Sequence, residues 1–503
     1  MSSSSLASRA EKAVKWSAVT TAARFVLQLG AQVALARVLG PGNYGIYGIG
    51  IAVLTFAAFL SGSAFSYSLM LQERVDDADI RFAFTWQALA GTAMAIVMLL
   101  GAPALAGFFG DARVEPMVQW LALACLLAAL SAPAICLLQR DLNFRALGLV
   151  QLVSYAAGYL AVGLPLALSG WGAQSLALAC VVQAAVLLVG VYWVRPHPVR
   201  PLFRHAGGAQ ALGTGKTVFL TNIVNWTLGN LDRIIIGRLL SAHAVGIFTL
   251  AYNFAQIPYT LLVSAVQPTF LASGAKMAHE PHRLAQAWLL VLACVLVLFT
   301  PVAVGLALVT HDLVRLLYGP AWGEAAWVLA LMFLCLPAWA GWGLSTPVLW
   351  NTGRKHYEVL LQLPLLALAI PVWWYLTPLG LRWAVAATAV LIYLRSLVIV
   401  AAGLRALGMR WSPLAPLLLR GLALAAWCGA AIVATQALVA PLDMAIVSLL
   451  AGSVAGLVAG LAVVLVAPQL LGEQARLALS RLLPIDRIKP PAAPIVGTPQ
   501  GQP

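Results

Sequence analysis

The sequence predicts an all-α polytopic membrane protein with about fourteen transmembrane helices, and three observations support this fold class. Hydrophobic residues make up 62% of the 503 residues and charged residues only 9%, which leaves too few polar side chains to cover a water-soluble surface. Apolar blocks of about 20 residues, the length that crosses a bilayer as a helix, follow one another with short polar breaks. The blocks are continuous rather than alternating, so their backbone groups must be satisfied within helices and not in a β-barrel.

The apolar blocks give the predicted spans in order along the chain. They cover residues 14–38, 44–71, 82–108, 114–138, 147–168, 172–194, 216–239, 244–272, 284–310, 324–350, 357–376, 380–404, 413–436 and 443–468. The first block is too long for a signal-peptide core and lacks a small-residue cleavage site, so we predict a retained span after an N-terminal segment of residues 1–13. Residues 469–503 form a proline-rich tail, which we expect to be disordered from Pro484 onwards.

The distribution of Lys and Arg predicts the orientation of the chain. Of the 30 cationic residues, 21 fall in segments on the same side of the membrane as the N-terminus and five on the opposite side. Short loops rich in these residues stay in the cytoplasm, so both termini are predicted to be cytoplasmic. The cations are spread over many loops, and no basic domain lies outside the membrane. The net charge of +14 therefore needs no nucleic-acid partner.

A short motif recurs along the chain. Residues 37–47 read Arg-Val-Leu-Gly-Pro-Gly-Asn-Tyr-Gly-Ile-Tyr and recur 201 residues later, at 238–248, as Arg-Leu-Leu-Ser-Ala-His-Ala-Val-Gly-Ile-Phe. A repeat of six helices enters the membrane twice from the same side, so its copies should be related by an axis along the membrane normal. The predicted organisation is an N-lobe (14–194), a cytoplasmic linker (195–215), a C-lobe (216–410), two additional spans (411–468) and the tail.

Polar side chains recur at helical spacing inside the first span of each lobe. In the first span they are Thr21, Arg24, Gln28 and Gln32, and in the seventh span they are Asn222, Asn225, Gly229, Asp232 and Arg233. The offset of 201 residues maps Arg24 onto Asn225 and Gln32 onto Arg233, in the register of the loop motif. Both lobes are therefore predicted to present a polar face on their first helix.

The charges in these stripes have two interpretations. A charge at mid-membrane costs about 2.5–3.5 kcal/mol, so Arg24 and Asp232 should face each other or a water-filled cavity. An ion pair between them would hold the lobes together without contacting substrate. Alternatively, Arg24 and Arg233, with Arg395 in the twelfth span, form a cationic cavity suited to phosphate oxygens. In that case Asp232 is the candidate for binding a coupling ion.

The eighth span carries a further candidate binding face. Tyr252, Gln256 and Tyr259 lie near one side of the predicted helix and could contact sugar hydroxyls and ring faces. Hydrogen bonding between helices is the alternative role for the same side chains.

Three motifs resemble those of the oligosaccharide flippases of the polysaccharide biosynthesis family, within the multidrug/oligosaccharidyl-lipid/polysaccharide exporter superfamily. The motifs are Arg37-x-Leu39-Gly40-x-x-x-Tyr44-Gly45, Gln139-Arg140-x-x-x-Phe144-Arg145 and Asn351-Thr352-Gly353-Arg354. The resemblance implies two six-helix lobes that work by alternating access in the bacterial inner membrane. The implied cargo is an undecaprenyl-pyrophosphate-linked oligosaccharide for O-antigen, capsule or exopolysaccharide synthesis.

The resemblance also implies binding partners and a site residue. The partners are the lipid-linked oligosaccharide, the membrane lipids and, as an open alternative, a polysaccharide polymerase or export machinery. Arg24 matches the cationic cavity residue that members of the family commonly carry.

The sequence contains no pattern for a catalytic, metal or cofactor site. The six cysteines are dispersed through predicted helices without metal spacing, and all seven histidines lie in loops or near span ends. A membrane-embedded polysaccharide-assembly enzyme would require carboxylates in a sizeable loop, and the predicted outer loops are short. A drug/cation antiporter would favour an acidic cavity, whereas Asp232 is the one deep acid. Both remain alternatives to the flippase.

Overall fold

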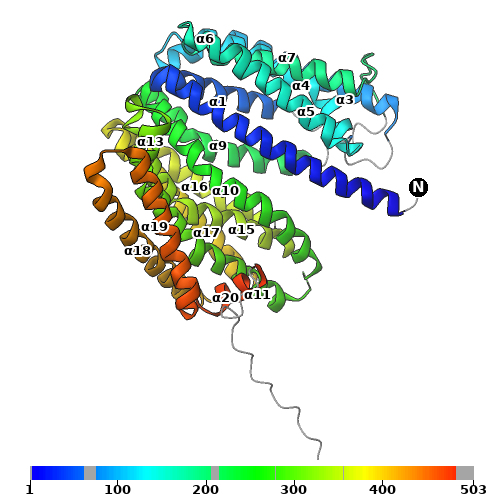
Figure 1. Ribbon diagram of the computed structural model, residues 1–503. Coiled ribbons are helices and arrows are strands. Elements are labelled where there is room, and N and C mark those ends of the chain that lie inside the picture. Colours follow the sequence, from blue (N-terminus) through cyan, green and yellow to red (C-terminus); the bar gives the residue numbers. More distant parts are fainter. Residues whose placement is uncertain are drawn as a thin grey trace, which may run out of the picture. The chain divides into compact units, whose positions relative to one another are not determined.

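Every regular element in the described part of the chain is a helix (Figure 1). The computed structural model describes residues 3–61, 69, 75–205, 215–277, 279–354 and 356–482. The predicted all-α polytopic fold is confirmed. The chain divides into two compact units, which comprise Met1–Ala251, Leu317–Val328 and Gln362–Thr388, and Tyr252–Leu316, Leu329–Leu361 and Ala389–Pro503.

The fourteen predicted ranges fall on helices wherever the chain is described, but the number of spans is not confirmed. Within the described residues, ten helices are long and apolar enough to cross a membrane, or eleven if the bent pair Ala325–Leu334 and Leu336–Asn351 is one span. The helix α1 (Ser3–Leu60) counts once although it covers the first two predicted ranges. The helices α9 (Gly215–Leu239) and α10 (Ala242–Lys276) are not among the ten. Polar side chains such as Asn253 and Gln256 lower the hydropathy of α10.

A bend at Gly40 separates the two predicted spans that α1 contains. Gly40 adopts φ 68° and ψ 173°, a left-handed conformation that residues with a Cβ rarely occupy. The next residue, Pro41, has no backbone N–H with which to continue the helical hydrogen bonds. In the second copy of the motif the break is complete, because α9 ends at Leu239 and α10 begins at Ala242.

In the first unit α1 packs along helices that follow it in sequence (Figure 1). These helices are α3 (Asp77–Phe109), α4 (Val114–Arg140), α5 (Phe144–Tyr155), α6 (Leu164–Leu168) and α7 (Gln174–Val194), with a π-helical segment (Ala156–Gly163) between α5 and α6. A capping box begins α3, where Asp76 accepts a bond from the backbone N–H of Asp79. This bond holds the pKa of Asp76 below its ordinary value. Gly110 ends α3 in the left-handed conformation.

The first half of the predicted linker is bound to α3. Its backbone and side chains make hydrogen bonds with the first turns of that helix, namely Arg81 Nε to Arg200 O (3.0 Å), Leu202 N to Thr85 Oγ1 (2.9 Å), Trp86 Nε1 to Phe203 O (3.3 Å) and His205 Nε2 with Asp79 Oδ1 (2.8 Å). Burial lowers the pKa of His197, which lies in the same segment. Residues 195–205 thus form an ordered strap, and the rest of the linker, 206–214, lies outside the described residues.

The two copies of the repeated motif contact each other through glycine. A Cβ on Gly45 would overlap the carbonyl oxygen of Ala242, and a Cβ on Gly246 would overlap that of Pro41. These pairs are equivalent under the offset of 201 residues. Reciprocal contacts of this kind are produced by a local twofold relation between the copies. The close approach depends on glycine at both positions because the opposing atoms are backbone atoms that cannot rotate away.

Arginine contacts at the ends of the same helices are also reciprocal. Arg238 donates to the carbonyl oxygen of Phe108 at 2.7 Å, and its guanidinium lies 5.3 Å from the centre of the Phe108 ring. Its equivalent, Arg37, has its Nε 3.8 Å from the position of a Cβ on Gly319. In each case the Arg of one copy meets the end of a later helix in the other copy.

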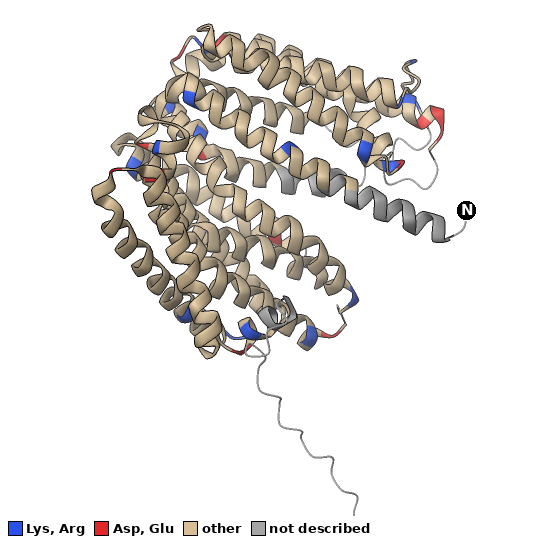
Figure 2. Cartoon of the chain, viewed as in Figure 1, with Lys and Arg blue, Asp and Glu red and all other residues tan. Residues whose placement is uncertain are grey.

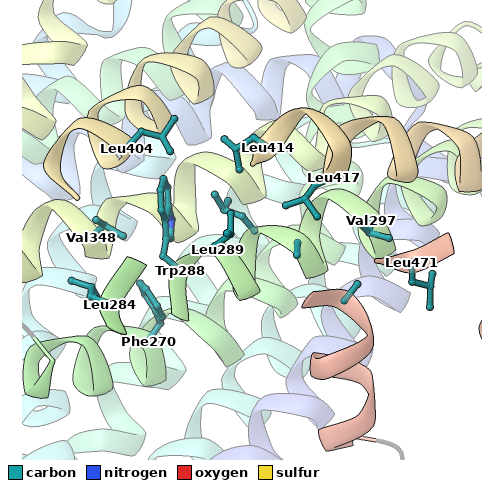
Figure 3. Close-up of a cluster of buried hydrophobic side chains, with 13 residues drawn as sticks. Phe270, Leu284, Trp288, Leu289, Val297, Val348, Leu404, Leu414, Leu417 and Leu471 are labelled. Carbon is teal, nitrogen blue, oxygen red and sulfur yellow. The ribbon is translucent and has the colours of Figure 1, made fainter. Parts of the chain in front are cut away.

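The second unit has an apolar core centred on Trp288. It contains most of α10 and of α14 (Ala325–Leu334), α11 (Pro281–Ala293), a π-helical segment (Cys294–Phe299), α12 (Thr300–Leu308), α13 (Thr310–Leu317), α15 (Leu336–Asn351), parts of α16 (His356–Leu376) and α17 (Leu381–Ala406), α18 (Leu414–Val439), α19 (Ala445–Val466) and α20 (Glu473–Leu482). Trp288 is fully buried among side chains that include Leu404 and Leu414 (Figure 3). A Cβ on Gly403 would lie 3.0 Å from the Trp288 ring, so α17 approaches this ring as closely as a glycine permits.

Most charged residues lie toward the ends of the helices, with long uncharged stretches between them (Figure 2). This distribution is the one expected for helices whose middle sections lie in hydrocarbon. Two terminal segments contain more helix than the sequence indicated. Helix α1 begins at Ser3, within the predicted N-terminal segment, and α20 occupies part of the predicted tail. The predicted disorder from Pro484 falls outside the described residues.

The contact between motif copies gives the first prediction. Gly246→Ala should lower the free energy of unfolding by about 1–3 kcal/mol, because the added methyl overlaps the backbone at Pro41. Gly30→Ala in α1 is the matched control, since a Cβ there meets no atom within 4 Å and the helix should gain about 0.5–1 kcal/mol. Thermal melting of both variants in detergent measures the difference. Equal midpoints would contradict the reciprocal packing.

Candidate functional site

The polar stripe of α1 is directed toward α5 and toward the bend in α1. Arg24 Nη1 donates to Gln151 Oε1 at 2.6 Å, and Gln32 Nε2 donates to the Tyr44 hydroxyl at 2.9 Å. Gln28 lies half-buried one turn after Arg24. The bond of Arg24 joins α1 to α5, and the bond of Gln32 joins the two parts of α1 across the bend at Gly40. The stripe thus belongs to a polar network inside the first unit.

The opposite side of this network was missed at the sequence level. Gln151, Tyr155 and Tyr159 follow one another at intervals of four residues along α5 and its π-helical continuation. The hydroxyls of Tyr47 and Tyr159 lie 2.7 Å apart, and the rings of Tyr155 and Tyr159 stack with centres 4.5 Å apart. The interval of four residues was a signal for a second polar face in an otherwise apolar span. A π-helical segment at this position fits a functional role, because such segments are frequent at functional sites.

The charged residues of α9 lie side by side. Asp232 is 1% exposed, and its Oδ1 accepts a hydrogen bond from the backbone N–H of Arg233 at 2.7 Å. Arg233 Nη1 is 3.5 Å from Asn230 Oδ1, and the guanidinium interacts electrostatically with the Tyr44 hydroxyl. Asn225 is half-buried two turns earlier. Arg233 and Gln32, which correspond in the repeat, are therefore both associated with Tyr44.

Arg24 and Asp232 do not form an ion pair among the described residues. The hydrogen-bond partner of Arg24 is the neutral amide of Gln151, and that of Asp232 is a backbone N–H. The interpretation in which this pair pins the repeats together has no support in this conformation. The positive charge of Arg24 is oriented but not neutralised by its partner.

The second unit contains an aromatic cluster around a third cation. The centre of the Trp339 ring lies 5.3 Å from that of Tyr252 and 6.0 Å from that of Tyr259. The Trp342 ring stacks on Tyr259 at 6.5 Å, and the guanidinium carbon of Arg395 lies 3.7 Å from the centre of the Trp342 ring. A cation over an indole face is a favourable pair that is worth about 2 kcal/mol or more when desolvated. Arg395 is thus held inside its span by aromatic faces.

The sequence found one side of this cluster and missed the other. Tyr252 and Tyr259 were predicted from the spacing on α10, but their partners Trp339 and Trp342 lie on α15. Two tryptophans in the middle of a predicted span, away from the membrane interface that such residues usually favour, were the available signal. The predicted Gln256 is half-buried on α10, and Gln267 of the same helix donates to the Gly343 carbonyl at 2.9 Å.

One group of side chains in the described residues has the spacing of a metal site. Asp76, Asp79 and His205 each offer a ligand atom, and these atoms lie within 4.8 Å of one another. The capping box and the contact between the strap and α3 account for their proximity.

Comparison with known proteins places the chain among relatives. Residues 34–327 match the family described as "Polysaccharide biosynthesis protein". The chain belongs to this family. The match covers more than half of the chain and includes both copies of the repeated motif, α1 from residue 34 onward, and α9. The polar stripe of α1 lies before the matched residues.

Curated relatives come from several polysaccharide pathways. The chain is 27% identical to the succinoglycan biosynthesis transport protein ExoT of Rhizobium meliloti (strain 1021) over 64% of this chain and 65% of the relative. It is 23% identical to the lipopolysaccharide biosynthesis protein WzxC of Escherichia coli (strain K12) over 65% and 67%. It is 22% identical to the teichuronic acid biosynthesis protein TuaB of Bacillus subtilis (strain 168) over 63% and 66%. The chain thus matches about two thirds of the length of these relatives.

Solved structures extend the likeness in fold to most of the chain. The lipid II flippase MurJ, in an inward closed conformation, aligns with a TM-score of 0.69 at 14% identity and covers 88% of this chain and 97% of its own. An inward-facing multidrug resistance transporter of the MATE family, in the MOP superfamily, aligns with a TM-score of 0.59 at 13% identity and covers 76% and 94%. The family member described here therefore has the fold of these transporters.

The separation of Arg24 from Asp232 gives the second prediction. If the two formed a buried pair, removing one partner would cost about 3–5 kcal/mol. We expect Asp232→Asn to cost less than about 1.5 kcal/mol, because the amide oxygen can still accept the bond from the Arg233 backbone. The free energy of unfolding that the double variant with Arg24→Gln loses should equal the sum of the losses of the two single variants to within about 0.5 kcal/mol. Melting in detergent measures all three variants, and a larger coupling would restore the ion-pair interpretation.

Proposed function

We propose that this member of the polysaccharide biosynthesis family is a flippase that moves a lipid-linked oligosaccharide from the cytoplasmic to the outer leaflet of the bacterial inner membrane. The observation that carries the proposal is the environment of Arg24. Its guanidinium lies within a predicted span and donates to a neutral amide, so its charge is available to an anion. A protein that needed Arg24 only for stability would pair it with an acid.

A phosphate or pyrophosphate is the anion that this arrangement suits best. The guanidinium of arginine is charged at all relevant pH values and presents a planar fork of donors that matches phosphate oxygens. One of those donors is occupied by Gln151, which orients the group. The pyrophosphate of an undecaprenyl-linked substrate would supply the missing negative charge at a depth where an unpaired cation is costly.

The aromatic cluster of the second unit suits the sugar part of such a substrate. Aromatic rings offer apolar faces to the C–H faces of pyranose rings, and Tyr252 and Tyr259 add hydroxyls for hydrogen bonds. Arg395 adds a cation to the same cluster, which would suit acidic sugars. The relatives are named for succinoglycan, lipopolysaccharide and teichuronic acid synthesis, which supports a carbohydrate substrate.

Transport by alternating access would require one side of the protein to close while the other opens. We place both termini in the cytoplasm on the Lys and Arg distribution, which puts the Gly45–Gly246 contact at the outer end of the helices. In this arrangement the glycine contact closes the outer side. Asp232 is the proposed site of ion coupling, because it is buried within a span and does not pair with Arg24. A polymerase or export machinery would receive the translocated product.

Translocation in proteoliposomes tests the proposal. The wild type should translocate an undecaprenyl-pyrophosphate-linked oligosaccharide, and Arg24→Ala should reduce the rate about 10- to 100-fold, because a charge-assisted hydrogen bond to substrate is worth about 1.5–3 kcal/mol. Arg420→Ala is the matched control, since it removes an exposed arginine of α18. Unchanged transport by Arg24→Ala would remove Arg24 from the site. Absence of transport by folded wild type, with efflux of organic cations, would establish the antiporter instead.

Cross-linking tests the proposed outer closure. The position of a Cβ on Gly48 lies 3.5 Å from the Cβ of Thr249, a separation at which disulfides form. Gly48→Cys with Thr249→Cys should cross-link under mild oxidation, lose nearly all transport and recover it on reduction. Each single cysteine variant serves as a control and should transport under both conditions. Full transport by the cross-linked protein would show that this contact does not need to open.

A further inference from the structure

The first unit contains a cavity that the proposed phosphate and sugar sites do not use. It has a volume of about 580 Å³, within the range of about 300–1,000 Å³ that is usual for ligand pockets. Its walls come from the second half of α1, from α3 and from α9. Side chains that represent these three walls are Phe56 and Leu60, Met94 and Leu105, and Arg233 and Ile234.

The cavity is lined almost entirely by apolar side chains. Trp226 is one exception, but its indole N–H donates to Thr55 Oγ1 at 3.2 Å, and its ring packs on Phe56 with centres 4.6 Å apart. The polar atom of Trp226 is therefore already hydrogen-bonded. Arg233 contributes the one charged side chain of the lining. Apolar walls of this kind favour an apolar guest over ordered water, which needs several polar partners.

Two of the α3 side chains that line the cavity are also exposed. Val97 and Phe108 both line the cavity, yet they are 61% and 42% exposed. In a membrane, surface of this kind contacts hydrocarbon. Both side chains therefore offer apolar surface that a hydrocarbon chain can contact.

The depth of Arg233 distinguishes a carrier lipid from an ordinary phospholipid. Arg233 lies six residues before the end of α9, a rise of about 9 Å along the helix. Phospholipid phosphates lie at the helix ends, where Arg238 is located, and the guanidinium of Arg238 is bound to Phe108. A phosphate at the level of Arg233 has left the headgroup layer, as that of a transported lipid must do.

We propose that this cavity binds the hydrocarbon tail of a polyprenyl-phosphate-type carrier lipid, with Arg233 contacting the phosphate nearest the tail. The choice of a carrier lipid rests on the proposed flippase function. The tail would enter past Val97 and Phe108 and lie against α1, α3 and α9. The protein would then recognise the lipid part of the substrate as well as its phosphate.

A substitution that fills the cavity tests the proposal. A Cβ on Gly101, which lines the cavity, meets no atom within 4 Å, so the side chain of Gly101→Leu can enter the cavity without disturbing its neighbours. Gly107→Leu on the same helix is the matched control, because Gly107 also has open space around it and does not line the cavity. Ala104→Phe is a second filling variant if Gly101→Leu does not fold.

Binding is measured by native mass spectrometry with three probes: undecaprenyl phosphate, undecaprenol and a phosphatidylglycerol. We expect Gly101→Leu to weaken binding of undecaprenyl phosphate and undecaprenol about tenfold, the effect of losing roughly two buried methylenes, and Gly107→Leu to leave both unchanged. Arg233→Gln should weaken binding of the phosphate and leave binding of the alcohol unchanged. Phosphatidylglycerol should be insensitive to all three variants.

Two results would overturn the proposal. Equal binding of undecaprenyl phosphate by wild type and both filling variants would place the tail elsewhere, and an equal loss for phosphatidylglycerol would make the cavity a general phospholipid site. These results do not depend on translocation. If the wild type translocates and the filling variants bind like the wild type, the cavity proposal alone fails. If the wild type binds through the cavity and does not translocate, the flippase proposal fails and a carrier-lipid site remains.

Discussion

The compensation of positive charge within apolar helices is the constraint on which the rest of this structure depends. Arg24, Arg233 and Arg395, three of the arginines within the predicted spans, have different neighbours. A neutral amide orients Arg24. Asn230 and Tyr44 are neighbours of Arg233. An indole face covers Arg395. The amide that orients Arg24 does not cancel its charge as an acid would. Arg24 therefore leaves a positive potential in a low-dielectric region, where an anion gains most from it. Residues that weaken the apolar pattern of a helix are thus the residues that suggest its function.

The repeated motif supplies the framework that holds two of these arginines. Gly45 and Gly246 allow helix backbones to meet where any side chain would separate them, and Arg37 and Arg238 contact the ends of later helices in a reciprocal way. The polar residues are then arranged differently on this symmetric framework. The first copy carries Arg24 and Gln32, whereas the second carries Asn225 and Arg233 at the equivalent positions. At each of these two equivalent positions one copy carries a guanidinium and the other an amide, so the binding properties of the copies differ although their backbones correspond.

The same residues explain why apolarity alone undercounts the spans. Helix α10 carries Asn253, Gln256 and Gln267 in addition to its aromatic residues, and its composition is less apolar than that of a helix that only anchors the chain. The bend at Gly40 likewise hides one span by joining it to the next. A helix that binds a polar substrate must expose polar atoms inside the membrane, and neighbouring helices can offset that cost. The helices least typical of a membrane anchor are therefore those that carry the candidate site.

The sequence by itself determined the fold class, the positions of the helices and the polar faces on α1, α9 and α10. Hydropathy and helical periodicity are properties of consecutive residues, so they can be read before any tertiary contact is known. Only the tertiary structure decided the partners: Gln151 rather than Asp232 for Arg24, Trp342 for Arg395, and one glycine contact for the repeated motif. The cavity beside Arg233 could not be predicted from the sequence either, since its walls come from three separate helices, α1, α3 and α9. The physical reason is that the rotation of each helix about its own axis is fixed by packing against other helices, and that packing is not encoded in any single span.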